Sequence, residues 1–393
     1  MGIFSKDKSE LMLVFNIGSS NVGGAIFEAQ ESGIPKIIFS ITEPIILDDE
    51  FSTDRFLSLT MQALDNVANK IYKTGKGIPN EIFCVLSSPW HVSQTRIISL
   101  KKNTPFIFTA KLAEELIKKE ISLFEEEHLS KTINTDAPNR TIELKNIKTI
   151  LNGYETTEPL SKKIKELEMI VFISMGEETI LKKIEDTIGK YFHFRQIKFS
   201  SFMLSSFTVV RDMHIQKENF LLLDIDGEVT NISMIKKNVL RESITFPLGR
   251  NFLVRGVASS LKCTLSEASS LISLLKDGHA EEKATQKLSL AIEQLRKEWL
   301  KSFQESLANL SNDISIPATI YMTTDKDLAD FFCQTIKAEQ FNQYTLTESK
   351  FEINFLNTQT FHGLAVFEDG AIRDPGLIID AIYINRFLTK NYA

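Results

Sequence analysis

The chain has 393 residues, of which 43% are hydrophobic and 24% charged, with a formal net charge of −6 and a pI near 5.7. These values are ordinary for globular proteins and exclude a mainly disordered or fibrous chain. Because an acidic chain does not attract nucleic acid or anionic lipid through its overall charge, we expect no nucleic-acid partner. At roughly 100–200 residues per domain, the length predicts two or three domains or one large divided one.

Cysteine usage and hydropathy point to the cytoplasm. Cys84, Cys263 and Cys333 lie far apart, no CxxC motif occurs, and the six histidines are scattered, so the sequence predicts neither a disulfide framework nor a zinc site. No apolar run reaches the ~18–20 residues of a membrane span. Residues 1–10 are too short and too polar for a secretory signal.

The first half of the chain opens with two apolar strands, expected at 11–15 and 25–27, around a tight turn at 18–21. A helix is expected over 53–73, where apolar residues recur every three or four positions. The other elements expected in this half are strands at 36–46, 82–87, 92–100, 141–151, 166–175 and 193–198, helices at 109–126 and 177–190, and a polar loop at 127–140. The β-α-β-β pattern after residue 82 indicates a small α+β subdomain inserted into a larger α/β unit.

The second half begins like the first. An apolar strand at 220–223 runs into Asp224, a turn follows, and a second strand is expected at 232–235. An offset of 208 positions places Asn16 on Asp224 and Gly18 on Asp226, which is a weak internal repeat. The later elements expected are strands at 239–246 and 318–323 and helices at 250–260, 264–276, 285–310, 325–337 and 375–388. The stripe of the 285–310 helix fits packing on a sheet or an intermolecular coiled coil.

Four stretches carry a family resemblance. They are VFNIGSSNVGGAIFE (14–28), LLLDIDGEVTNISMI (221–235), FPLGRNFLVRGVASSLKCTLSEASSLI (246–272), and the insertion with LNGYETTEPLSKK (151–163). Their order resembles the bacterial actin-like superfamily, and within it the cell-division protein FtsA, with its relative PilM next.

The resemblance implies an α/β actin-like (ASKHA) duplicated fold with two lobes, an inserted SHS2-like 1C subdomain and a reduced 2B subdomain. The implied divisions are 1–81 for the first part of the first lobe (1A), 82–170 for the insertion, 171–215 for the second part of 1A, and 216–393 for the second lobe (2A), with 2B largely missing around 276–285.

In this superfamily ATP lies between the lobes, its phosphates held by backbone N–H groups of the two hairpin turns and its Mg²⁺ by strand-end carboxylates through water. The resemblance implies no catalytic residue here and Asp224 as the metal-binding residue. The nucleotide-binding positions it implies are Asn16, Gly18, Ser19, Ser20, Asn21, Asp224, Gly227, Thr230, Gly249, Thr323 and Thr324.

Four departures from the family pattern argue against tight binding of ATP and Mg²⁺. Asn16 replaces the first aspartate, threonines replace the Gly-Gly turn at 323–324, and subdomain 2B is nearly absent. Asp226 and Glu228 stand where glycines face phosphate. A unit charge about 4 Å from a phosphate oxygen costs roughly 4 kcal/mol at an effective dielectric of 20, almost a thousandfold in affinity, unless the side chain points away or binds a cation. At most a weak ATPase is expected.

The leading functional hypothesis is an FtsA-like scaffold that self-associates into filaments and binds an FtsZ-like or membrane divisome protein. The alternative on the same fold is a PilM-like adaptor of a type IV pilus or secretion machine, and a second alternative is an active ATPase or kinase of the superfamily. Only five residues follow the helix ending at 388, so the usual C-terminal membrane anchor is expected to be missing and a partner to recruit the protein to the inner face of the membrane. Trp90 and His91 fit a buried core pair or a partner-contact patch.

Overall fold

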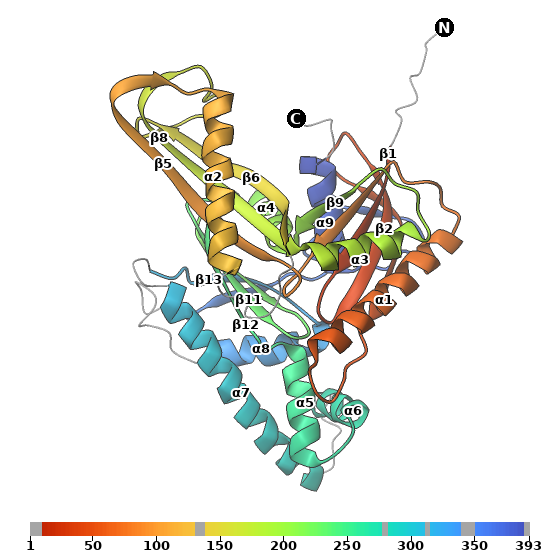
Figure 1. The fold of residues 1–393 in the computed structure, drawn as a ribbon. Helices are drawn as coiled ribbons and strands as arrows, with labels where there is room; N and C mark the ends of the chain where they lie inside the picture. Colours follow the sequence, from red (N-terminus) through yellow and green to blue (C-terminus); the bar gives the residue numbers. More distant parts are fainter. Residues whose placement is uncertain (1–9, 130–137, 277–281, 311–314, 339–349, 389–393) are drawn as a thin grey trace.

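A computed structural model describes residues 10–129, 138–276, 282–310, 315–338 and 350–388. The described chain forms two lobes and an insertion that projects away from them (Figure 1). No helix of this described part is both long and apolar enough to cross a membrane.

The first lobe is built on a six-stranded sheet in the order β15-β3-β2-β1-β4-β9. Its strands are β1 (Glu10–Ile17), β2 (Asn21–Ala29), β3 (Lys36–Pro44), β4 (Glu81–Leu86), β9 (Ile197–Ser201) and β15 (Val366–Phe367). Alternate residues of β1 face opposite sides: Leu13 and Phe15 pack with α1 (Thr53–Lys73) and α3 (Glu178–Gly189). Met12 and Val14 pack with α4 (Phe202–Met213) and α9 (Pro375–Tyr383).

The second lobe has a five-stranded sheet in the order β12-β11-β10-β13-β14. Its elements are β10 (Phe220–Ile225), β11 (Thr230–Lys236), β12 (Val239–Phe246), β13 (Thr319–Thr324), β14 (Glu352–Phe355), α5 (Arg250–Leu261), α6 (Leu265–Lys276), α7 (Glu282–Leu310) and α8 (Lys326–Ala338). The apolar stripe of α7, with Trp299 and Phe303 fully buried, packs within this lobe's core. Of the two alternatives for helix α7, packing on a sheet is therefore the one that the structure shows.

The two lobes repeat one topology, which confirms the internal repeat. In each, the first strand pairs antiparallel with the second and parallel with the fourth, as β1 does with β2 and β4, and β10 with β11 and β13. Both hairpin turns are closed by the same bond: Gly18 N–H donates to Asn21 O (3.1 Å), and Asp226 N–H donates to Val229 O (3.0 Å). Each of these positions is related to its counterpart by the offset of 208.

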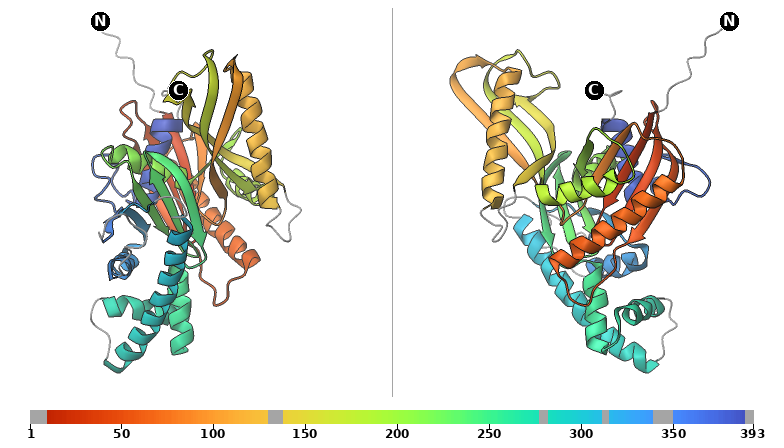
Figure 2. Two further views of the ribbon diagram at one scale, coloured as in Figure 1. Left: turned by 90° about the vertical axis from the view of Figure 1, so that its left-hand side faces the viewer. Right: turned by 45° about the vertical axis from the view of Figure 1, so that its right-hand side comes forward.

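The insertion is a four-stranded antiparallel sheet in the order β5-β8-β6-β7, with one face covered by α2 (Ala110–Leu129), as Figure 2 shows. Its strands are β5 (Val92–Ile107), β6 (Asn139–Leu151), β7 (Tyr154–Glu155) and β8 (Lys163–Glu177). The predicted boundary at 82 is corrected: β4 pairs with β1 and β9 in the first lobe, so the insertion begins after Leu86. Likewise β8 continues to Glu177, beyond the expected boundary at 170.

Several elements differ from the prediction. Helix α4 was not expected, because all its positions from Leu204 to Val210 are buried and no 3.6-residue stripe remains visible. The short strands β7, β14 and β15 were also not expected. Strand β9 starts at Ile197 rather than at 193, and the last helix changes to a π-helical turn at 384–388. Residues 130–137 of the expected loop and 277–281 of the reduced 2B region lie outside the described residues.

Candidate functional site

The two hairpin turns touch one another in the cleft between the lobes. The Asp226 carboxylate accepts hydrogen bonds from the backbone N–H groups of Ser19 (2.6 Å) and Ser20 (3.0 Å). It also accepts from its neighbour Gly227 N–H (2.8 Å), while Glu228 N–H donates to the Ser19 hydroxyl (2.9 Å). The backbone donors that would face phosphate groups are therefore satisfied by the protein itself.

Glycines allow this close approach. A Cβ on Gly227 would lie 2.3 Å from the carbonyl oxygen of Ser19, and one on Gly249 would lie 2.3 Å from that of Asp226. Both contacts are to backbone, which cannot move aside as a side chain can. Gly227 and Gly249 were predicted to let the backbone approach a nucleotide. In the structure they let it approach another segment of the chain instead.

The second acidic residue of the turn points away from the cleft. Glu228 forms a two-pronged ion pair with Arg255 (2.7 and 2.9 Å) and accepts from the Asn251 amide (2.8 Å). Arg255 also donates to Asp48 O of the first lobe (2.9 Å). Only Asp226 of the two acids thus enters the phosphate position.

Both strand-end residues have side-chain hydrogen-bond partners. Asp224 accepts from the Thr323 hydroxyl (2.7 Å) and the Asn231 amide (3.2 Å), and burial, with the charge of Asp226, raises its pKa to about 7. At the equivalent position the Asn16 amide donates to Asp380, which burial also brings to a pKa of about 7.

The space that remains in the cleft is small. It is a cavity of about 110 Å³, whereas ligand pockets usually measure ≈ 300–1,000 Å³. Of the predicted positions, it is lined by Asn16, Gly18, Ser20, Asn21, Asp224, Thr323 and Thr324. Thr230 is instead fully buried, donates to Leu248 O (2.7 Å) and accepts from the Trp299 indole (3.2 Å).

These residues do not fit the ATP and Mg²⁺ that the fold family implies. The hairpin donors are used, the cavity is too small for a nucleotide, and no group of three possible metal ligands occurs within the described ranges. Asp224, the expected metal-binding residue, already accepts hydrogen bonds from Thr323 and Asn231, and its burial raises its pKa.

Trp90 and His91 form the buried pair that the sequence allowed. Trp90 stacks on Phe56, with ring centroids 5.0 Å apart, and donates to Gly18 O (2.9 Å), so it supports the first turn from behind. His91 has no hydrogen-bond partner among the described residues, and burial lowers its pKa to about 4. The sequence did not identify Asp380 as part of the cleft, although a lone charge in the apolar α9 was an available signal.

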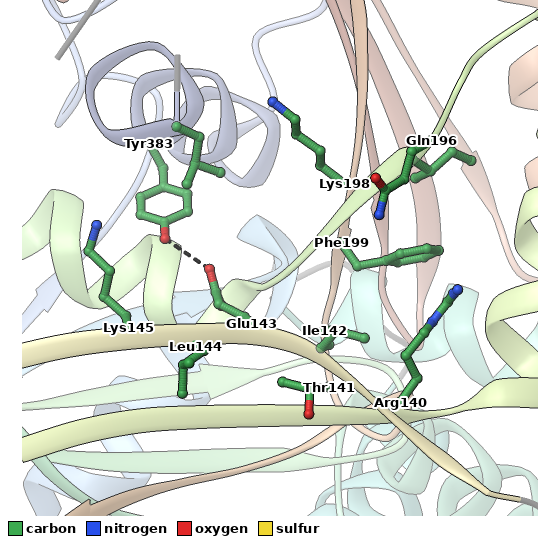
Figure 3. Close-up of a pocket in the computed structure, with 12 residues that line it drawn as sticks. Arg140, Thr141, Ile142, Glu143, Leu144, Lys145, Gln196, Lys198, Phe199 and Tyr383 are labelled. Carbon is green, nitrogen blue, oxygen red and sulfur yellow. Dashed lines mark hydrogen bonds between the residues drawn. The ribbon is translucent and has the colours of Figure 1, made fainter. Parts of the chain in front are cut away.

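A larger pocket lies where the insertion meets the first lobe (Figure 3). It measures about 380 Å³ and lies between residues 140–145 of β6 and 196–199 at β9. In Figure 3, Tyr383 and Lys145 lie at one end, and Arg140, beside the ring of Phe199, at the other. No sequence motif indicates this pocket, because its walls come from distant segments.

The carboxylate of Glu143, a half-buried residue, joins the walls of this pocket. It accepts from the N–H (3.0 Å) and hydroxyl (2.8 Å) of Ser201 and from the Tyr383 hydroxyl (2.9 Å), and it also accepts from the Ser200 hydroxyl. Burial raises the pKa of Glu143, and these four donors oppose that rise. The insertion is thereby fixed to β9, α4 and α9.

Both strands at the pocket have a free edge. Strand β9 is the last of the six-stranded sheet, and the outer edge of β6 pairs with β7 only at Ile150 and Leu151 among the described residues. Edge strands present backbone N–H and C=O groups that can pair with another chain. The pocket is thus bordered by two stretches of unpaired strand backbone.

No protein-family model matches the sequence, and no curated protein matches it. Among solved structures, it is similar to one described as a PilM–PilN type IV pilus biogenesis complex, with a TM-score of 0.60, 12% identity and coverage of 97% of this chain and 98% of that chain. Two weaker matches are the ethanolamine utilization protein EutJ from Carboxydothermus hydrogenoformans (TM-score 0.42, 10% identity, 95% and 89% covered) and a Bacteroides thetaiotaomicron protein with an actin-like ATPase fold (TM-score 0.41, 8% identity, 97% and 98% covered).

At 12% identity the first match shows the fold alone, and the resemblance to FtsA or PilM stays a prediction. Together with the repeated strand order of the two lobes, the match leads to one conclusion: the chain has the two-lobed α/β actin-like ATPase fold.

Proposed function

We propose that this protein is a PilM-like adaptor, which binds an extended segment of a membrane partner in the pocket between β6 and β9. The observation that carries the proposal is the pocket of about 380 Å³ bordered by two free strand edges. Added strands are a common mode of peptide recognition, in which main-chain hydrogen bonds give affinity and side-chain pockets give specificity.

The lining favours a segment with apolar side chains. Ile142, Phe199 and Leu388 offer apolar surface. Two of the three cations at the pocket are already paired, Arg140 with Glu178 and Glu185 and Lys198 with Glu81. A strongly acidic segment therefore gains little here, and backbone pairing with apolar contacts supplies the affinity.

The comparison favours the pilus adaptor over the division scaffold, because the similar structure is a complex of PilM with PilN. The partner class that we propose is accordingly a PilN-like protein of a pilus or secretion machine. An active ATPase or kinase is not favoured, because the cleft does not fit its nucleotide. Self-association and a division partner stay predictions of the sequence.

The test is co-purification from the source cells with a matched pair of variants. Gln196→Trp fills the pocket from an exposed position of its lining, whereas Arg195→Trp places the same ring on the adjacent exposed residue outside the lining. We expect wild type and Arg195→Trp to retain a membrane protein of the pilus or secretion class that Gln196→Trp loses. Retention of that protein by both variants contradicts the proposal, and so does its absence from the wild-type sample.

A further inference from the structure

A side chain of the protein itself occupies the phosphate position of the cleft. Asp226 points from the second lobe into the turn of the first, where consecutive N–H groups of Ser19 and Ser20 converge on its two oxygens, Oδ2 at 2.6 Å and Oδ1 at 3.0 Å. Consecutive backbone donors of this kind form an anion-binding concavity. A carboxylate held by such donors replaces the phosphate oxygens that they hold in nucleotide-binding relatives of the fold.

We infer that the Asp226 carboxylate takes the place of a nucleotide phosphate and holds the two lobes together without ATP. Ser19 is fully buried under this contact, so water does not compete for its N–H. The contact is reciprocal, because Glu228 N–H of the second turn donates to the Ser19 hydroxyl. Gly227 lets the two backbones meet at a distance that no Cβ would permit.

A second contact also joins the two lobes. Arg255 of α5 donates to Asp48 O in the segment between β3 and α1 (2.9 Å), while Glu228 holds its guanidinium in place. Two contacts thus join the lobes at this turn. Asp226 makes one of them inside the phosphate position, and Glu228 supports the other, through Arg255, from outside it. The inference concerns the cleft alone and does not depend on what binds between β6 and β9.

Hydrogen exchange with Asp226→Asn and Glu228→Gln tests this role. Each variant removes one charge from the same turn, but only Asp226→Asn removes the carboxylate from the Ser19 and Ser20 amides. We expect slow exchange at these two amides in the wild type and at least about tenfold faster exchange in Asp226→Asn. Glu228→Gln should give a smaller increase, because it weakens the hold on Arg255 but leaves the Asp226 carboxylate on both amides. Fast exchange in the wild type, or equal exchange in the wild type and Asp226→Asn, overturns the inference.

Calorimetry gives an independent measurement on the wild-type chain, which remains decisive if a variant does not fold. We expect no binding of Mg-ATP or inorganic pyrophosphate up to about 1 mM. Asp226→Ala frees the amides and removes the like charge, so it should bind pyrophosphate at least about tenfold more tightly than the wild type. Micromolar Mg-ATP binding by the wild type shows instead that the cleft takes the nucleotide and overturns the inference.

Discussion

Glu143 of the insertion accepts hydrogen bonds from both the N–H and the hydroxyl of Ser201, the N-cap residue of α4. A helix N-terminus favours a negative charge, which helps to stabilise a carboxylate in this half-buried position. Because α4 lies between the sheets of the two lobes, this contact fixes the insertion to the shared core rather than to a surface loop.

Glu143→Ala should lower the free energy of unfolding by about 3 kcal/mol, because it leaves buried donors on Ser200, Ser201 and Tyr383 without their acceptor. Urea unfolding measures the change. The matched control is Glu155→Gln, at an exposed carboxylate paired with Lys148, which should change stability by less than about 1 kcal/mol. Equal effects of the two variants would show that Glu143 has no anchoring role.

Tyr383→Phe should cost about 1 kcal/mol, the usual net value of one hydrogen bond, because the ring keeps its packing in the core and only the bond to Glu143 is lost. The same urea experiment applies. In a double-mutant cycle with Glu143→Ala, the two changes should be less than additive. Additive changes would mean that the two side chains do not interact.

Asp380 gives the fold a pH dependence of definite sign. Its pKa is about 7 in the folded protein and about 3.9 when unfolded, so the folded state keeps the proton longer and the free energy of unfolding falls as pH rises between these values. Asp380→Asn removes this fall in the free energy of unfolding. Relative to the wild type, the variant should gain about 2–3 kcal/mol between pH 5 and pH 8.

The difference between variant and wild type is the quantity to measure, because His91 acts in the opposite direction. Burial lowers the pKa of His91 to about 4, so its protonation destabilises the fold as pH falls below about 6.5. The difference between the unfolding curves of the two proteins at a series of pH values isolates the contribution of Asp380, because both proteins share those of His91 and Asp224. A variant gain that does not change with pH would contradict the raised pKa of Asp380.

Gly227→Ala should separate the two turns and cost about 1–3 kcal/mol, because its Cβ would lie 2.3 Å from Ser19 O and 2.5 Å from Ser19 C. The control is Gly189→Ala at the end of α3, where the nearest atom is 3.8 Å away. Alanine is the better helix former, so this variant should range from unchanged to about 1 kcal/mol more stable. Thermal unfolding of the pair distinguishes close contact between the turns from a general cost of replacing glycine.

The fold was largely predictable because its signals are local. The hairpins at 10–29 and 220–236 each combine an apolar strand, a polar strand end and a tight turn, and the repeat is visible at one offset. Helix α4 was missed because burial between two sheets removes the amphipathic period. Its apolar sequence is consistent with a strand as well as with a buried helix.

The sites were less predictable because they depend on long-range pairing. The sequence placed Asp226 at the phosphate position but did not decide whether its side chain enters the cleft, which depends on Ser19, 207 positions away. Similarly, the pocket beside the insertion is set by Glu143 and Ser200, 57 positions apart. Neither segment has a motif that indicates the other.

Site-specific crosslinking at Lys145 tests the central claim, that the pocket between β6 and β9 receives the partner. Lys145 is exposed and lines the pocket, whereas Tyr154 of β7, 80% exposed, lies outside the lining of this pocket. A photo-reactive phenylalanine placed at each position in the source cells should form an adduct at 145 with an extended segment of a membrane protein of the pilus or secretion class, and none at 154. Absence of that adduct at 145, or equal adducts at both positions, would contradict the account.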